Sequence, residues 1–196
     1  MPENYTIDMP EAVRNIIHTI EEHGFKAYAV GGCIRDSILG RNPDDWDITT
    51  SAVPAQIKTF FKRTIDTGIV HGTVTVMVNK TGYEVTTYRI DGEYEDGRHP
   101  KSVEFSDRLV DDLCRRDFTI NAMAYNEVDG IVDLYNGQKD IENKIINFVG
   151  NAEERIIEDP LRILRAFRFM SRLGFSLSEK TVEAIKKQKN LLISIP

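Results

Sequence analysis

Residues 31–47, GGCIRDSILGRNPDDWD, constrain the fold of this chain more than any other stretch. A short apolar segment, residues 26–30, leads into two adjacent glycines, and a helix-forming segment and an Asn-Pro turn follow them. Successive side chains of an extended segment point to opposite faces, so Asp45 and Asp47 share one face while Trp46 takes the other. The pattern predicts a strand–turn–helix unit followed by a second strand that bears two acids.

Both ends of this unit suit phosphate chemistry. Two carboxylates on one strand face repel each other unless a cation lies between them, and a few hard oxygen ligands of this kind suit Mg²⁺. Gly31 and Gly32 at a strand-to-helix junction let the backbone approach an anion closely and direct amide groups at it. Each feature alone has a plainer interpretation, as a tight turn or a solvated strand end. Together they favour phosphoryl or nucleotidyl transfer.

Periodicity and turn residues predict the other elements. Helices are expected at residues 10–23, 33–39, 54–63 and 109–125, and strands at 25–30, 45–50, 73–78, 82–88, 130–134 and 144–148. The strands at 73–78 and 82–88 are expected to pair as a hairpin across residues 79–81. Residues 90–108 are rich in Gly, Pro and charge and are expected to form a long loop. From residue 151 onward every signal is helical. We therefore predict an α+β fold, with a mixed-sheet head at residues 1–150 and an all-helical neck at residues 151–196.

Charge is distributed unevenly along the chain. The formal net charge is −6, but the 38 residues from Asp159 to Pro196 contain eight Lys/Arg against three Asp/Glu. This asymmetry indicates either a basic element that serves an acidic ligand or an ordinary solvated helix face, and both interpretations are open. No apolar run is long enough for a membrane span, and the N-terminus lacks the pattern of a signal peptide, so a cytoplasmic protein with no membrane partner is expected.

Several charged residues are candidates for a ligand site, each with a structural alternative. Arg35 is expected to face the same phosphates as the glycine amides, or to form a surface salt bridge with Asp36. Glu84 is a candidate third carboxylate of the metal site, or simply an exposed residue of its strand. Arg116 is placed to reach a triphosphate, or to be neutralised by neighbouring aspartates.

The last long helix carries an arginine stripe. One side of this helix carries the apolar residues Ile163, Ala166, Phe167, Met170 and Leu173, which are expected to pack inward. The other side carries four arginines: Arg162, Arg165, Arg168 and Arg172. Four arginines along one stripe repel one another unless a polyanionic or acidic partner neutralises them. Asp159 and Pro160 before the stripe also have a plain structural interpretation, as a helix cap followed by proline in the first turn.

With these pieces in place, the sequence resembles the family of class II tRNA nucleotidyltransferases (CCA-adding enzymes) and bacterial poly(A) polymerases, of the polymerase-β-like nucleotidyltransferase superfamily. Four stretches carry the resemblance, in the family's order: GGCIRDSILGRNPDDWDIT, DGEYEDGRHPKSVEFS, LCRRDFTINAMAYN and EDPLRILRAFRFMSRLGF. Four motifs in the correct order are far more specific than any one alone. The resemblance implies a polymerase-β-like nucleotidyltransferase head followed by a helical neck.

The resemblance also implies roles for individual residues. Asp45 and Asp47 would hold Mg²⁺, with Glu84 as a third carboxylate, in a two-metal transfer to the 3′ end of tRNA that releases pyrophosphate. Nucleotide binding would fall to Gly32, Arg35, Arg116, Asp159, Arg162, Arg165 and Arg168. CTP and ATP are the implied nucleotides.

Base reading by Asp159 and Arg162 has a physical rationale of its own. Cytosine and adenine each present an exocyclic amine beside a ring-nitrogen acceptor, which a carboxylate and a guanidinium can satisfy. Uracil and guanine instead present a carbonyl in place of the amine and a ring N–H in place of the acceptor. An Asp/Arg pair on a rigid helix can thus accept C and A and reject U and G without a template.

Several functional alternatives are open. Family members run to roughly twice this length, so the chain is expected to be a head-and-neck fragment shortened before the body and tail domains. CCA addition is the first expectation, with CC-only addition, A-only addition and poly(A) synthesis as alternatives within the family. In this family CC-adding members lack the flexible loop, so the loop-like stretch at residues 90–108 counts against that option. A catalytically silent nucleotide- or RNA-binding module is the alternative from a different class.

Overall fold

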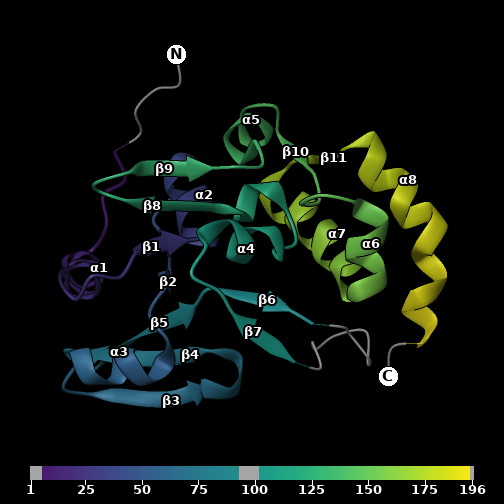
Figure 1. Ribbon diagram of the computed structural model, residues 1–196. Coiled ribbons are helices and arrows are strands. Elements are labelled where there is room, and N and C mark those ends of the chain that lie inside the picture. The colour runs from purple at the N-terminus through teal and green to yellow at the C-terminus, as the bar shows by residue number, and fades with distance from the viewer. Residues whose placement is uncertain (1–5, 93–101, 195–196) are drawn as a thin grey trace.

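A seven-stranded mixed sheet forms the head in the computed structural model, which describes residues 6–92 and 102–194 (Figure 1). The strand order is β3-β4-β5-β2-β1-β8-β9. Strands β2 and β5 run parallel, and the other neighbouring pairs are antiparallel. The strands are β1 (Ala27–Val30), β2 (Asp47–Thr50), β3 (Thr64–Gly68), β4 (Thr73–Val78), β5 (Thr81–Thr87), β8 (Met123–Asn126) and β9 (Gly130–Asp133).

Helices cover both faces of this sheet. The head helices are α1 (Glu11–Glu22), α2 (Gly32–Ile38), α3 (Pro54–Phe60), α4 (Leu109–Cys114) and α5 (Gly137–Glu142). The larger core includes alternate residues of the central strands, such as Ala29 and Ile48, and the buried face of α1. The opposite face forms a smaller core in which Tyr28, Val30 and Tyr88 pack with Leu113 of α4. Strand β2 therefore lies between two apolar layers, with its first residue, Asp47, exposed.

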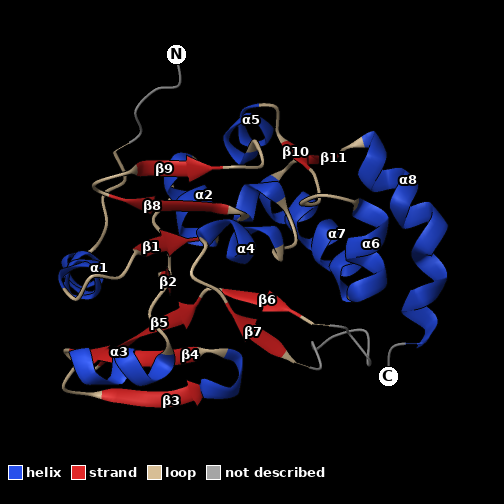
Figure 2. Ribbon diagram, in the orientation of Figure 1, coloured by secondary structure: helices blue, strands red, loops and turns tan. Residues whose placement is uncertain are grey.

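The neck packs against one end of the sheet (Figure 2). It contains α6 (Ala152–Glu158), α7 (Leu161–Leu173) and α8 (Glu179–Gln188), followed by a short 3₁₀ turn, η3 (Lys189–Ser194). The prediction of an all-helical neck was wrong in one detail, because β11 (Ser176–Leu177) pairs in parallel with β10 (Ile145–Ile146) of the head. Residues of both parts, such as Phe118 and Ile163, belong to one hydrophobic core.

The prediction of one long helix over residues 109–125 was wrong. Helix α4 ends at Cys114, a short 3₁₀ turn, η2, spans Thr119–Asn121, and β8 follows it in the sheet between β1 and β9. The Asp117 carboxylate accepts a hydrogen bond from the backbone N–H of Phe118 (2.7 Å), which stabilises the break. Residues with good helix propensity form a strand here because sheet pairing on both sides outweighs local preference.

Three further predictions needed correction. The stretch at residues 90–108 begins and ends in a β-hairpin, β6 (Arg89–Asp91) with β7 (Val103–Phe105); its middle lies outside the described residues. The strand predicted at residues 45–50 starts at Asp47, so Asp45 precedes it. The strand predicted at residues 144–148 is reduced to β10, and β3 was not predicted.

The α+β architecture was predicted correctly, as were most head elements. Strands β4 and β5 form the expected hairpin, with Val78 opposite Thr81 and positive φ at Asn79 and Lys80. Positive φ at both central residues is the turn geometry that matches the twist of two-residue hairpins. Among residues 6–92 and 102–194, no helix combines the length and the apolar character needed to cross a membrane.

Candidate active site

A cleft of about 590 Å³ lies where the head meets helices α6 and α7. Its described lining residues include seven arginines and four aspartates, so it is strongly polar and suited to an anionic ligand. The lining residues are Gly31, Gly32, Arg35, Asp47, His71, Arg89, Asp91, Arg115, Arg116, Asp117, Asn121, Asp159, Arg162, Arg165, Phe169 and Arg172.

The predicted glycine turn forms one wall of this cleft. Gly31 has φ +85°, a conformation that L side chains rarely adopt, and its N–H donates to the Met123 carbonyl of β8 (3.0 Å). A Cβ atom at Gly31 would lie only 2.9 Å from Arg116 Nη1. The absence of a side chain therefore lets the Arg116 guanidinium lie against the turn, beside the start of α2.

The acid pair lies at the same end of the sheet. Asp45 and Asp47 are exposed and Trp46 is buried, which is the alternation expected from the sequence. Although the Asp47 carboxyl can still reach solvent, its pKa is raised, mainly because the surrounding protein displaces water, with Asp45 adding like-charge repulsion and Arg116 opposing the shift. A cation between the two acids would relieve this repulsion.

Glu84 lies beside Asp47 in the sheet. Ile48 of β2 pairs in parallel with Val85 of β5, and Asp47 and Glu84 are the residues that precede this pair. Within the described parts of the chain, however, no three His, Cys, Asp or Glu residues gather into a group that could hold a metal ion. The donor set therefore fits a cation held by the two aspartates and completed by phosphate or water oxygens, which is a common arrangement for Mg²⁺.

A chain of polar contacts joins α2 to α7 across the cleft wall. Arg35 Nη1 donates to Asn121 Oδ1 (2.5 Å), and Asn121 Nδ2 donates to Asp117 Oδ1 (3.1 Å). Arg165 of α7 then donates to Asp117 Oδ2 through Nε (2.8 Å) and Nη2 (2.5 Å). The Phe169 ring lies near both guanidiniums, with Arg35 Cζ at 5.1 Å and Arg165 Cζ at 5.7 Å from its centroid. These cation–π contacts add to the polar ones.

Arg35 lines the cleft, and it also forms the expected ion pair with Asp36, through Nε (2.9 Å) and Nη2 (2.8 Å). The pair is not on the surface, because the Arg35 side chain is only 5% exposed. A buried guanidinium in this position contributes a fixed positive charge to the cleft.

The proposed base-reading residues lie at the junction of α6 and α7. Asp159 Oδ1 accepts a hydrogen bond from the Leu161 N–H (3.0 Å), so Asp159 also caps α7, as its structural alternative predicted. Arg162 donates through Nη1 to Glu158 Oε2 (2.7 Å) and to the Arg155 carbonyl (2.9 Å). Glu158 accepts from Arg155 as well, and Arg162 Nη2 donates to the Arg115 carbonyl (3.3 Å), so the Arg162 side chain is oriented by its own helix junction and by the head.

Not every predicted site residue reaches the cleft. Gly32, Arg35, Asp47, Arg116, Asp159, Arg162 and Arg165 line it. Asp45, Glu84 and Arg168 are not among its lining residues, and Arg168 is exposed on α7. Phe167, predicted to pack inward, is 44% exposed, whereas Phe169 faces the cleft.

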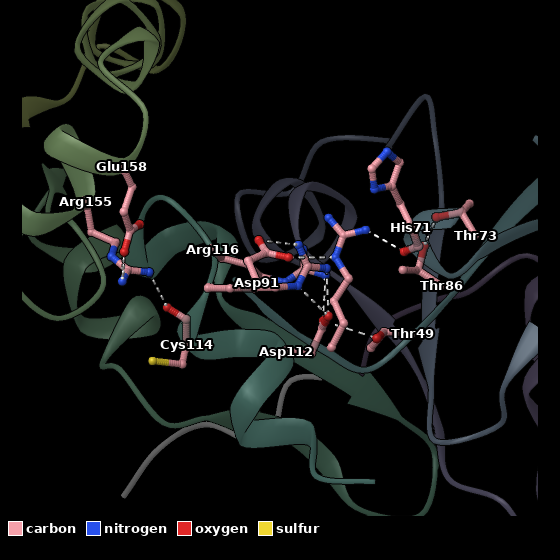
Figure 3. A network of polar contacts seen from close by, with 12 residues as sticks. Thr49, His71, Thr73, Thr86, Asp91, Asp112, Cys114, Arg116, Arg155 and Glu158 are labelled. Atoms are coloured by element: carbon pink, nitrogen blue, oxygen red, sulfur yellow. Dashed lines mark hydrogen bonds and ion pairs between the residues drawn. The ribbon is translucent and has the colours of Figure 1, made fainter. Parts of the chain in front are cut away.

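Sequence reasoning missed a second group of cleft residues that surrounds strand β6. Arg89 Nη1 donates to the His71 carbonyl (2.5 Å), and Arg89 Nε lies 3.0 Å from Asp91 Oδ1 (Figure 3). Arg115 Nη1 lies 3.9 Å from Asp91 Oδ2. The only sequence signal was the dense charge around residues 89–116, because ion pairs between distant segments have no periodicity to reveal them.

Comparison with known proteins agrees with this geometry. Residues 27–147 match the poly A polymerase head domain. The CCA-adding enzyme of Lactiplantibacillus plantarum is 50% identical over 185 residues, which are 94% of this chain and 46% of that protein. The chain thus spans about half the length of the curated relatives it matches.

Solved structures show the same relationship. The crystal structure of the Bacillus stearothermophilus CCA-adding enzyme in complex with CTP matches with a TM-score of 0.86 and 45% identity, over 95% of this chain and 45% of that one. A tRNA nucleotidyltransferase complexed with a primer tRNA and an incoming ATP analog matches with a TM-score of 0.74 and 32% identity, over 92% of this chain and 52% of that one. The head, the cleft and these matches together place the chain in the poly A polymerase head domain family.

Proposed function

We propose that this chain carries the catalytic and base-reading parts of an enzyme that adds CCA to the 3′ end of tRNA from CTP and ATP. The observation that carries the proposal is that a single arginine-rich cleft joins Asp47 of the head to Asp159 and Arg162 of the neck junction. A metal-binding acid and a base-reading pair in one cleft are what template-independent nucleotidyl transfer needs. The relatives named CCA-adding enzymes support this substrate assignment.

Asp45 and Asp47 are the residues that would hold Mg²⁺, with Glu84 beside them on β5. When bound, Mg²⁺ would neutralise the triphosphate and favour ionisation of the attacking 3′-hydroxyl. Gly31 and Gly32 leave room for the phosphates, while Arg35 and Arg116 supply positive charge toward them. This charge favours the transition state, in which negative charge builds up on the leaving pyrophosphate.

Base selection is assigned to Asp159 and Arg162. The contacts of Arg162 with Glu158 and the Arg155 carbonyl limit its rotation, so it can present a fixed donor edge. Asp159 is restrained by capping α7. Restrained polar groups discriminate strongly, because a mismatched base leaves them buried and unpaired. Arg165 supports the pocket through Asp117, whereas the exposed position of Arg168 gives it no direct part in our proposal.

Nucleotide incorporation on a tRNA that lacks its 3′ end tests this function. The reaction contains Mg²⁺ and each triphosphate separately, then CTP with ATP, and compares this chain with the longest natural form of the protein. We expect two C additions and then one A, with UTP and GTP refused. Asp47→Ala in the same protein should abolish incorporation without unfolding it.

Other outcomes assign other functions. CC alone or A alone indicates a split-function enzyme, and a long A tail indicates a poly(A) polymerase, for which the matched head domain is named. Absence of incorporation by the longest form would contradict the proposal and favour a silent nucleotide-binding module.

A further inference from the structure

Asp112 is a buried carboxylate that does not line the cleft but contacts two residues that do. Its exposed fraction is 0%, and it lies in the short helix α4. It accepts hydrogen bonds from Arg115 through Nε (3.0 Å) and Nη2 (2.7 Å), and from Arg116 Nη2 (3.0 Å). Figure 3 shows the Asp112 carboxylate with Arg116 and Thr49, the residues that it contacts.

Asp112 also contacts the strand that bears the catalytic acid. Its Oδ2 atom accepts a hydrogen bond from Thr49 Oγ1 (3.1 Å). Thr49 follows Asp47 by two residues on β2, so both side chains point to the same face of the sheet. One carboxylate therefore fixes the arginine pair relative to the strand of Asp47.

This carboxylate is charged in the folded protein. Burial alone would raise the pKa of Asp112, but the adjacent Arg116 and Arg115 outweigh burial, and the pKa lies below its ordinary value. Hydrogen bonds between charged partners in a buried site are strong and directional. The carboxylate thus limits where the two guanidiniums can lie.

The Arg116 guanidinium has capacity left for a ligand. One of its nitrogens is held by Asp112, Nη1 lies next to the Gly31 turn, and Nε has no hydrogen-bond partner among the described residues. A buried donor without an acceptor is unfavourable in the empty protein. An anion in the cleft would supply further acceptors to this guanidinium.

We propose that Asp112 is a positioning residue for triphosphate binding, which holds Arg116 against the Gly31 turn at a fixed place relative to Asp47. The ligand class, a nucleoside triphosphate, rests on the function proposed above. Asp112 itself touches neither substrate nor metal. Its removal should weaken binding of the phosphates more than it slows the chemical step.

The test is Asp112→Asn, which keeps the shape of the side chain and removes its charge. We expect the Kd for inorganic tripolyphosphate with Mg²⁺, and for CTP with Mg²⁺, to rise by about tenfold in calorimetric titration, the usual size of an outer-shell effect. In incorporation assays KM for CTP should rise by a similar factor, with kcat within about threefold of the wild type. A merely structural role would instead lower the active fraction, and hence kcat, at unchanged KM.

Two controls accompany this variant. Asp129→Asn removes the charge of another carboxylate of the head, which accepts a hydrogen bond from the Tyr28 hydroxyl (2.6 Å) and does not line the cleft. It should leave both affinities unchanged. In the Arg116→Ala background, Asp112→Asn should add less than about twofold, because residues that act through one another are not additive.

The outcomes are distinguishable. Unchanged tripolyphosphate affinity in folded Asp112→Asn, or full additivity with Arg116→Ala, would overturn the inference. If Asp112→Asn does not fold, Thr49→Val replaces it, because this variant removes one hydrogen bond to Asp112 and keeps every charge. A two- to threefold rise in the Kd for tripolyphosphate, of the order expected for one lost hydrogen bond, supports the inference. An unchanged Kd contradicts it. Loss of CCA addition in the longest wild-type form would refute the proposed function alone, since tripolyphosphate binding still tests Asp112.

Discussion

Arg165 of α7 donates two hydrogen bonds to a single carboxylate oxygen of the head, Asp117 Oδ2, through Nε (2.8 Å) and Nη2 (2.5 Å). The Asp117 side chain is 9% exposed, whereas that of Arg165 is 49% exposed. Arg165 thus keeps one edge against the head and another open to the cleft. Helix α7 is therefore joined to the head by a polar contact in the wall of the cleft itself.

Because of this contact, we expect Arg165 to contribute more to nucleotide binding than Arg168, a difference that the sequence alone could not predict. Arg165→Ala should raise KM for CTP by about tenfold, since it removes a charge-assisted pair and a cleft cation together. Arg168→Ala, three residues along the same helix, should change KM by less than about twofold, because a solvated surface charge contributes little. Steady-state incorporation measures both. Equal effects of the two variants would contradict the assignment.

Asp47 should destabilise the fold when no metal is present. Its pKa is raised above the ordinary value of 3.8, so the folded chain binds this proton more tightly than the unfolded chain does. The resulting loss of folding stability is absent well below pH 3.8, where the carboxyl is protonated in both states, and is fully present above the raised pKa. Asp47→Asn should therefore melt at a higher temperature than the wild type at pH 7 in EDTA.

Added Mg²⁺ should reverse this order. A cation that binds only the folded protein stabilises it by an amount that grows with the logarithm of the Mg²⁺ concentration relative to Kd, and the variant has lost a ligand. Thermal melts of wild type and Asp47→Asn, with EDTA and with Mg²⁺, measure both effects. A Mg²⁺-dependent rise in Tm of the same size in both proteins would contradict the assignment of Asp47 as a metal ligand.

Local signals were enough to predict the parts of the site that lie close together in the sequence. The glycine turn and the alternation of Asp45, Trp46 and Asp47 could be predicted because each depends on near neighbours in the chain. The capping role of Asp159 is of the same kind. These features follow from backbone geometry that a few residues determine.

The rest of the site depends on long-range contacts. Asn121 reaches the cleft only because the chain leaves α4 and enters the sheet as β8, and helical periodicity concealed that break. Phe169 faces the cleft because two guanidiniums lie near its ring, whereas helical periodicity favoured Phe167 as the inward residue. Sheet pairing and ion pairs between distant segments decided both positions.

Two buried tyrosines should respond in opposite directions to loss of the hydroxyl. The Tyr88 side chain is fully buried, and its hydroxyl has no hydrogen-bond partner in the part of the chain that the structure describes. Tyr88→Phe should leave stability unchanged or raise it by about 1 kcal/mol, because the unmade hydrogen bond is no longer a cost. Tyr28→Phe loses the bond to Asp129 (2.6 Å) and should lower stability by about 1 kcal/mol. Urea unfolding of both variants measures the contrast, and a clear loss of stability in Tyr88→Phe would refute it.

Gly31 should tolerate no side chain, for a reason separable from backbone strain. Gly24 and Gly31 both have φ +85°, so alanine at either position strains the backbone; the cost is about 1–3 kcal/mol at Gly31, whose ψ of −128° lies outside the left-handed helical region. A Cβ atom at Gly24 would meet nothing within 4 Å, whereas at Gly31 it would lie 2.9 Å from Arg116 Nη1. Gly24→Ala should therefore lower Tm and leave KM for CTP unchanged. Gly31→Ala should lower Tm at least as much and also raise KM by about tenfold, because Arg116 is displaced from the turn and one charged contact to the phosphates is lost. Thermal melts of the two variants measure the backbone strain, and incorporation kinetics measure the effect of the clash between the new Cβ atom and Arg116. An unchanged KM in Gly31→Ala would show that Arg116 need not lie against the turn.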